Sequence, residues 1–572
     1  MADDAAYLKK LNSYWEEGKR FRDVASKDWD SNPDMLKGDQ LPPARPPHKP
    51  PAVLNKLRSV SERKIALMTD TKPKFDVTPS KKGTSFSKMA GILKETSDAW
   101  WDDTSQDQNF ARGLYFPINF GNMIVQTGWS RTQQDIVLSM IDPRRFVFDP
   151  HVPSPMELHR AEYVILEEFP PLAELKMLYP DKASKLNAFK RPAGTWQRAK
   201  ELFMRGFGGG GVSATKREQE QADAVPRAWV RHFWLRDYTT TAKEVKKDGK
   251  THEVFTRKFP GGRYVITAGE DTILYDEANP YWDGQHPFDM MDWYVDVDSS
   301  WGLSEISALK NPQILYNKVI EVITENAMLM NNAMWIADYN AFDVDDWKQL
   351  TNIPGGIIKK RPGTDVHREY PQGVPGTVMQ LAQYLESFIE KEPGIHELTG
   401  KKPGQVQSGI GIESLQMLAA AMIRIKARAL ESLLQRVGQK IISRIVQFYT
   451  DDRVFHSVGP DGNFKEYIFV RKNFTEALSS QALRDAHRDF RFRVVPGSSL
   501  SMQKTQKALI YAELFKMGAV DDQAVLEALE IPDWQNILER TKAKQAMGLG
   551  PPVGGSGKKG GAQRQLKISG RI

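Results

Sequence analysis

The sequence predicts an α+β fold in which helices predominate. Residues 301–450 hold three stretches whose apolar side chains recur at helical spacing. Residues 135–149 and 228–275 instead alternate apolar and polar side chains between turn signals, as half-buried strands do. At 572 residues, with 14 Trp and 26 Phe, the chain is long enough for two or three domains or for one elongated subunit with several cores.

Composition excludes several kinds of site. The chain has no cysteine, which rules out a disulfide framework, a thiolate zinc site and a cysteine nucleophile. Its net charge is +7, but 72 acids nearly match 79 bases, so it is no polybasic nucleic-acid coat. No window approaches eighteen unbroken apolar residues, and Met1 to Tyr14 carries acids where a signal peptide needs bases, so we expect a protein kept in soluble form, without membrane contact.

The first 225 residues predict an arm, a connector and a mixed region. Aromatic residues among charges in residues 1–40 indicate one or two helices packed on the body. The Pro-rich run 41–51 predicts a stiff extended spacer, with a ligand for an SH3-like partner as the alternative. Residues 181–225 are rich in Lys, Gly and Ala, with a glycine-rich excursion at 204–225, and are most simply a surface excursion or disordered loop. We expect helices over 55–69, 87–104 and 171–179, a helix or strongly apolar segment over 109–132, and strands over 135–149 and 163–168, with a turn at Asp142-Pro143.

The later parts of the chain return to strands and then short helices. Antiparallel hairpin strands are expected over 228–238, 253–258, 263–268 and 272–275, and further strands over 466–470 and 490–495. Short helices are expected over 502–517, 521–530 and 534–547. From Gly548 onward Gly, Pro and Lys dominate, which predicts a disordered tail. Its bases face no acid: Lys558, Lys559, Arg564, Lys567 and Arg571.

The first of the three long helices is predicted to begin at Asn311-Pro312, a capping residue followed by proline at the first helical position. One apolar face carries Tyr316, Val319, Ile323, Ala327, Met330 and Met334. A second stripe carries Leu315, Val322 and Leu329. Because a small domain rarely covers a helix on two sides, we expect identical neighbours in a ring to cover the second stripe.

Residues 338–375 lie between the first two helices and are expected to form either a docking surface or a solvated loop. Short strand-like runs occur at 356–360 and 366–370. The excursion starts acidic and continues basic, with Asp343, Asp345 and Asp346 followed by Lys359, Lys360 and Arg361.

The second helix is predicted over 376–391 and the third over 412–449. In the second, Glu386 and Glu390 lie four residues apart without a base between them, which mildly destabilises a lone helix. Residues 394–411 have the composition of a mobile loop. The third helix contains no proline and would be roughly 57 Å long at about 1.5 Å per residue.

Motifs for catalysis are missing or weak. No G-x-x-x-x-G-K-[ST] loop is present, and the histidines show no metal-binding pairing. No G-x-S-x-G elbow supports a serine triad. Asp292, Asp296 and Asp298 could hold a divalent cation, but the glycine and glutamate of an EF-hand are missing, and a turn entering the core is the simpler interpretation. The sequence gives no positive argument for an enzyme, a cofactor or a metal.

The order of these parts resembles the portal (head-to-tail connector) proteins of tailed bacteriophages, and more the short-tailed group with a long subunit than the compact ones. The resemblance covers about residues 50–500. It rests on the helix 55–69 followed by Lys72-Pro73 and Val77-x-Pro79, on 136–150 with its Asp-Pro turns, on Trp301-Gly302 before a helix containing Gln313 and Asn317, and on the sequence of helix, hairpin, helix, loop and long helix.

What the resemblance implies is a cyclic ring, usually of twelve subunits, at one capsid vertex of a virion assembled in the bacterial cytoplasm. Double-stranded DNA would be packaged and ejected through its channel. Implied partners are the terminase large subunit, a head-completion or tail adaptor protein, and the major capsid and scaffolding proteins. The implied regions are an arm and connector (1–50), wing (51–302), stem helix (303–337), clip (338–375), second stem helix (376–393), tunnel loop (394–411), long wing helix with closing strands (412–500), crown helices (501–547) and a disordered basic tail (548–572).

Within that picture some polar residues acquire expected roles. Glu386 and Glu390 in the second stem helix would repel phosphates, so that the channel does not grip moving DNA. Residues of the tunnel loop would touch phosphates without reading sequence, namely Lys401, Lys402, Gln405 and Gln407. The alternative is that these are ordinary solvated helix and loop residues.

Two other functions compete with a portal. Another virion ring or tail-hub protein could use the same wedge-shaped subunit, without a loop that crosslinks to DNA. A metal-dependent nuclease using Asp292, Asp296 and Asp298 is the least favoured reading, and it would require cleavage that depends on a divalent metal and is lost on Asp296→Ala.

Overall fold

The chain divides into two compact units, residues 1–456 with 466–501 and residues 457–465 with 502–572. The computed structural model describes residues 2–41, 52–69, 72–189, 225–247, 250–331, 334–343, 347, 357–369, 373–393, 409–458, 464–472, 488–494 and scattered positions from 511 to 540. The predicted glycine-rich excursion lies almost wholly outside these residues, as do most of the predicted crown helices and the whole basic tail. Their interpretation stays a prediction.

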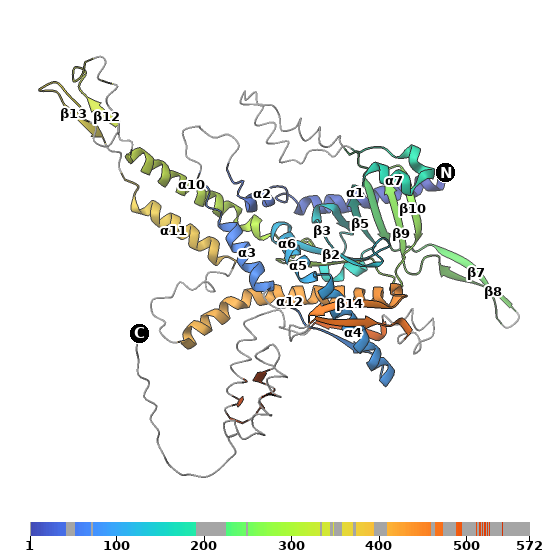
Figure 1. The fold of residues 1–572 in the computed structure, drawn as a ribbon. Helices are drawn as coiled ribbons and strands as arrows, with labels where there is room; N and C mark the ends of the chain where they lie inside the picture. Colours follow the sequence, from blue (N-terminus) through green and yellow to red (C-terminus); the bar gives the residue numbers. More distant parts are fainter. Residues whose placement is uncertain are drawn as a thin grey trace, which may run out of the picture. The chain divides into compact units, whose positions relative to one another are not determined.

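The structure confirms a mixed fold in which helix exceeds strand, with 48% of the described residues helical and 23% in strands. Figure 1 labels most of these elements. The α-helices are α1 (Ala2–Ala25), α2 (Asn32–Lys37), α3 (Lys56–Thr69), α4 (Thr84–Asp103), α5 (Gln106–Gly113), α6 (Tyr115–Phe120), α7 (Leu172–Leu178), α10 (Glu305–Asn331), α11 (Gly376–Lys391) and α12 (Gly409–Phe448). Three short 3₁₀ turns cover Pro143–Arg145, Pro155–Arg160 and Pro180–Lys185.

The strands form two larger antiparallel sheets and several pairs. The five-stranded sheet has the order β10 (Thr272–Ala278), β9 (Arg263–Ala268), β6 (Val230–Leu235), β5 (Tyr163–Glu168), β4 (Phe146–Phe148). The three-stranded sheet has the order β11 (Phe288–Asp292), β2 (Asn122–Ser130), β3 (Asp135–Ile141). The pairs are β1 (Phe75–Pro79) with β16 (Phe490–Val494), β12 (Met334–Ala337) with β13 (Val366–Glu369), β14 (Arg453–Val458) with β15 (Phe464–Phe469), and β7 (Thr240–Lys247) with β8 (Lys250–Arg257).

Helix α1 packs on the five-stranded sheet, as predicted for the aromatic N-terminal arm. Leu11 and Trp15 join a buried cluster with Phe233. The guanidinium of Arg231, fully buried, lies 4.6 Å from the Trp229 ring centroid and donates to Asn12 Oδ1 of α1 at 2.8 Å. Burial lowers the pKa of Arg231 to about 10. Because such a buried base needs its partners, α1 is an integral part of this core.

Helix α6 ends at Gly121, where the backbone passes close to that of Gly302. Gly121 adopts φ +86°, a left-handed conformation that favours glycine, and its carbonyl accepts from Trp293 N at 2.7 Å. A Cβ on Gly121 would meet the carbonyl of Gly302, and a Cβ on Gly302 would meet that of Gly121. The single helix or apolar segment predicted over 109–132 is therefore wrong as one element, because the chain turns at Gly121 from α6 into β2.

His286 sits in a site that accepts only the neutral imidazole. Its Nε2 is 2.9 Å from Leu158 O, and its Nδ1 accepts from Phe288 N at 3.3 Å. The ring is buried, and burial together with the charge of Lys440 lowers the pKa of His286 to about 3. One ring nitrogen donates and the other accepts, so a second proton would lose the Phe288 contact.

The long helix α12 confirms the helix predicted over 412–449. It is held to β11 by bases four residues apart: Lys440 donates to Phe288 O at 2.6 Å and pairs with Asp289 at 2.9 Å. Arg436 donates to Met290 O at 2.7 Å. Arg444, fully buried, pairs with Asp283 at 2.6 Å. The i, i+4 spacing of Arg436, Lys440 and Arg444 is visible in the sequence and places the three bases on one face of the helix, but their acidic and carbonyl partners were not predicted.

On another side of α12 lies the strand β16. Gly438 lets Phe492 approach the helix, since a Cβ there would overlap the phenyl ring. The Gln439 amide donates to Phe490 O at 2.9 Å and accepts from Phe492 N at 3.0 Å, as a neighbouring strand would. One edge of β16 is therefore paired with β1 and the other is bonded by a side chain of α12.

Candidate assembly site: the α10–α11 helix pair and its hairpin

Helix α10 begins at Glu305, six residues before the predicted start. Ser304 caps it, with its Oγ accepting from Ser307 N at 3.1 Å. Pro312 lies inside the helix and removes only the bond to the carbonyl four residues earlier. The prediction of a start at Asn311-Pro312 is wrong because the serine cap and the packing of the first turn outweigh the proline signal. The helix also ends at Asn331, so Met334 belongs to β12 rather than to the helical stripe.

The amides of Gln313 and Asn317 hold the extended segment that leads into α3. Gln313 Nε2 donates to Leu54 O at 2.9 Å, and its Oε1 accepts from Lys56 N at 3.1 Å. Asn317 Nδ2 donates to Gln40 Oε1 at 2.6 Å. These two residues, which carry part of the family resemblance, thus join α10 to the segments before α3.

A buried ion pair joins α3 to the first turn of α10. Lys64 Nζ lies 2.7 Å from Glu305 Oε2, and the two side chains are 3% and 2% exposed. Trp293 Nε1 donates to the same carboxylate oxygen at 2.7 Å. Lys426 of α12 lies nearby, 3.8 Å from the Tyr294 ring centroid, and burial lowers its pKa to about 8. The base of α10 is therefore fixed by charge as well as by apolar packing.

The predicted acidic pair on α11 is matched by bases of α3. Glu386 Oε1 lies 2.7 Å from Lys56 Nζ, and Glu390 Oε1 lies 4.0 Å from Arg63 Nη1. These contacts are the compensation that the sequence lacked within α11 itself. A role of the two carboxylates toward DNA is not tested by this geometry and stays a prediction.

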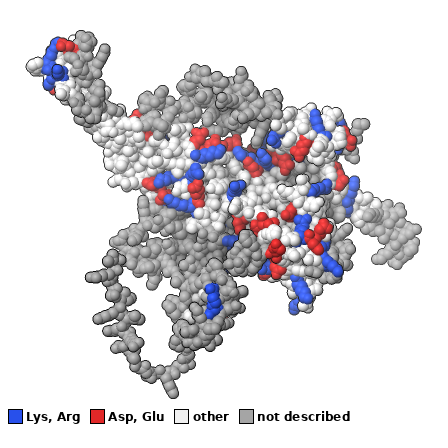
Figure 2. All heavy atoms as spheres, viewed as in Figure 1, with Lys and Arg blue, Asp and Glu red and all other residues white. Residues whose placement is uncertain are grey.

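One face of the α10–α11 pair is apolar and exposed. The predicted first stripe is partly buried, with Tyr316 and Val319 in the same core cluster as Leu385 of α11. The second stripe of α10 is open: Leu315, Val322 and Leu329 are 46%, 52% and 54% exposed. Further exposed apolar side chains are Met328, Met330, Met379, Leu381, Tyr384 and Phe388. The surface over this helix pair is largely uncharged in Figure 2, unlike the mixed charges over the sheets.

The two helices lie side by side, and β12 and β13 form a hairpin beyond their ends (Figure 1). The strand predicted over 366–370 is confirmed as β13, but the strand predicted over 356–360 is wrong in its described part, 357–360, since Met334–Ala337 pairs with β13 instead. Only two residues separate the end of α10 from the start of β12.

The hairpin carries several predicted docking residues. Arg361 pairs with Asp343, and Lys360 Nζ donates to Thr364 O at 2.7 Å. The backbone of Lys359 is described without regular secondary structure, and its side chain is exposed. Asp345 and Asp346 fall outside the described residues. So do the predicted loop residues Lys401, Lys402, Gln405 and Gln407.

The three aspartates considered for metal binding do not converge. Asp292 ends β11, whereas Asp296 lies in an exposed turn where its Oδ1 accepts from Asp298 N at 3.0 Å. Within the residues that the structure describes, no group of three or more His, Asp or Glu side chains could hold a metal ion.

Comparison with known proteins identifies the fold class that this helix pair, hairpin and long helix define. Residues 9–567 match the family of Phage P22-like portal proteins. A search of curated proteins found no match. None of the helices in the described ranges is long and apolar enough to cross a lipid bilayer.

The chain belongs to the Phage P22-like portal protein family. Membership supports a structural protein of the phage head-to-tail portal, and it supports no catalytic activity. The resemblance seen in the sequence is thus confirmed over nearly the whole chain.

Proposed function

We propose that this protein forms a closed ring of twelve subunits at one capsid vertex, and that DNA passes through it during packaging and ejection. The observation that carries the proposal is the exposed apolar stripe of α10, Leu315, Val322 and Leu329, beside the exposed apolar side chains of α11. A contiguous apolar surface of this kind marks an interaction site. In a cyclic ring each subunit presents two different faces to its neighbours, which suits a helix that is apolar on two sides.

The remaining parts of the proposal concern DNA and the assembly partners. The acidic residues Glu386 and Glu390 would discourage tight phosphate binding, while Lys401, Lys402, Gln405 and Gln407 would contact phosphates transiently. The hairpin with Asp343, Lys359, Lys360 and Arg361 would dock first the terminase large subunit and then the tail adaptor. Exposed charges and aromatic side chains at its surface support a docking role.

Native mass spectrometry of the purified protein tests the ring. A closed assembly of twelve subunits would have a mass on the order of 800 kDa, from a 64.9 kDa chain under cyclic symmetry. Val322→Glu should reduce the ring to monomers or small oligomers, because it places a charge in the buried contact. The control Met177→Glu changes an exposed apolar residue of α7 and should leave the ring intact. Rings that form equally well with Val322→Glu would exclude this face as the contact.

A further inference from the structure

An acidic and apolar loop projects between β11 and α10. Val295 and Val297 are 74% and 96% exposed, and they alternate with Asp296 and Asp298. The loop is closed at its base by the bridge between Tyr294 and Leu303, where Leu303 N donates to Tyr294 O at 2.9 Å. Two valines with so little cover expose apolar area that burial would stabilise by about 25 cal/mol per Å². The loop therefore offers exposed apolar and acidic side chains to the surface of another molecule.

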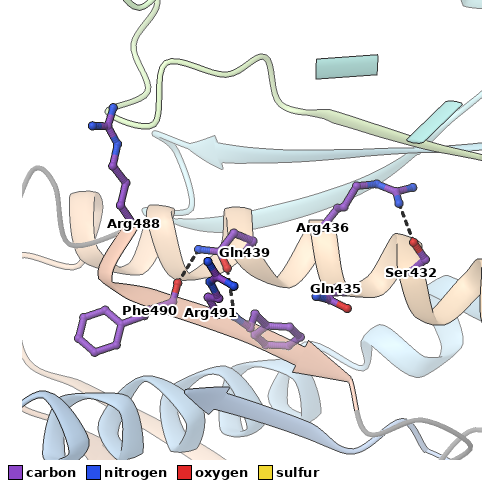
Figure 3. A pocket seen from close by; sticks show the side chains of 8 residues that line it. Ser432, Gln435, Arg436, Gln439, Arg488, Phe490 and Arg491 are labelled. Carbon is purple, nitrogen blue, oxygen red and sulfur yellow. Dashed lines mark hydrogen bonds between the residues drawn. The ribbon is translucent and has the colours of Figure 1, made fainter. Parts of the chain in front are cut away.

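A groove of complementary chemistry lies between α12 and β16 (Figure 3). It has a volume of about 490 Å³ and no acidic residue among its lining side chains. The lining residues are Ser432, Gln435, Arg436, Gln439, Arg488, Phe490, Arg491 and Phe492. Three arginines line it, which suits an acidic ligand, while the rings of Phe490 and Phe492 are buried in the core beneath it.

Two polar groups of this groove have no partner within the described part of the chain. The Arg491 guanidinium makes no hydrogen bond or ion pair there, and neither does the Gln435 amide. Arg436 differs, because it already donates to Met290 O at 2.7 Å and to Ser432 Oγ at 2.9 Å. In Figure 3 Gln435 comes from α12 and Arg491 from β16, so the two open donors belong to opposite walls of the groove.

We propose that the loop Val295–Asp298 of one copy docks into this groove of the next copy. Asp296 and Asp298 would meet Arg491 and the Gln435 amide. In the chain itself the loop does not occupy the groove, because Val297 is almost fully exposed. The contact joins two different surfaces, so it repeats head to tail, as the contacts of a cyclic ring do. This inference rests on the proposed ring and adds a specific contact between its neighbouring subunits.

Crosslinking tests the contact directly, because the chain has no cysteine of its own. The double variant Val297→Cys with Gln435→Cys, treated with a short bismaleimide, should give a ladder of covalent oligomers on a denaturing gel. Each single variant should give no ladder, because one cysteine has no partner at a head-to-tail contact. Both positions are exposed, so the fold should tolerate the changes.

The outcomes separate this inference from the proposed ring. Rings in native mass spectra without a ladder would overturn the loop contact alone. A crosslink that stays within one chain would also overturn it, because the loop would then reach its own groove. Protein that never assembles would overturn both proposals.

Charge reversal gives a second, independent measurement. Arg491→Glu should raise the protein concentration at which half the subunits are assembled at least tenfold, and adding Asp296→Arg should restore most of the loss. Equal assembly of Arg491→Glu and the unmodified protein would contradict the proposal. So would a double variant no better than the single one.

Discussion

The buried ion pair between Lys64 of α3 and Glu305 of α10 lies where the base of α10 meets the core. Lys64→Met removes the charge while keeping much of the side-chain volume. The Glu305 carboxylate then stays buried with Trp293 Nε1, at 2.7 Å, as its one remaining donor among the described residues. We expect a large loss of stability, because an unpaired buried charge is costly.

The size of the effect follows from geometry. At 2.7 Å and an effective dielectric constant of about 20, the attraction between Lys64 and Glu305 is about 6 kcal/mol, which offsets a desolvation penalty of several kcal/mol for each group. Removing one partner of such a pair costs about 3–5 kcal/mol. The matched control is Arg58→Met on the same helix, whose solvent-exposed i, i+4 pair with Glu62 should contribute little to stability.

Urea unfolding followed by circular dichroism, at one protein concentration for all variants, measures these differences. The double variant Lys64→Met with Glu305→Gln removes both charges, and it should be more stable than Lys64→Met alone. The reasoning is refuted if Lys64→Met unfolds at the same urea concentration as Arg58→Met. It is also refuted if the double variant is the less stable of the two.

Two further predictions concern the core. Gly302→Ala should lower the unfolding midpoint strongly, because its Cβ overlaps the carbonyl of Gly121, whereas Gly91→Ala in α4 meets nothing within 4 Å and should stabilise by about 0.5–1 kcal/mol; equal midpoints would contradict this. Because the pKa of His286 is lowered to about 3, folding stability should fall as pH drops below about 6.5, by about 1.4 kcal/mol per pH unit. His286→Gln should reduce the dependence of unfolding free energy on pH between about pH 6.5 and 5. The exposed control His151→Gln should leave that dependence as it is. An unchanged pH dependence in His286→Gln would refute the assignment of this effect to His286.

The sequence alone predicted most elements of this fold. The strand over 163–168 and the helix over 376–391 match β5 and α11 residue for residue, because their apolar periodicity and flanking prolines act locally. The turn at Asp142-Pro143 is likewise local, with Asp142 Oδ1 accepting from Arg144 N at 3.0 Å. Errors arose where a local signal competed with a distant contact. Helix α10 starts after Ser304 rather than at Asn311-Pro312, because the packing of its first turn against other segments fixes the start.

In the candidate site, too, some features could be predicted from the sequence and others depend on the fold. The second stripe on α10 could be read from spacing alone, because side chains seven residues apart share a helix face. The exposure of this stripe could not be predicted from the sequence, since it depends on which other segments cover that face of α10. Glu386 and Glu390 show the limit clearly: within α11 they are an uncompensated pair, and only the fold brings them to Lys56 and Arg63 of α3.

What the sequence determined by itself is the order of most helices and strands, the absence of cysteine chemistry and the resemblance to phage portal proteins. Each of these depends on neighbouring residues or on composition. The tertiary structure decided which charges meet, as in the pairing of Lys64 with Glu305, 241 positions apart. It also placed the groove between α12 and β16, whose walls are distant in the chain. Such contacts carry no local signature, because side-chain partners across a fold are chosen by packing and not by spacing.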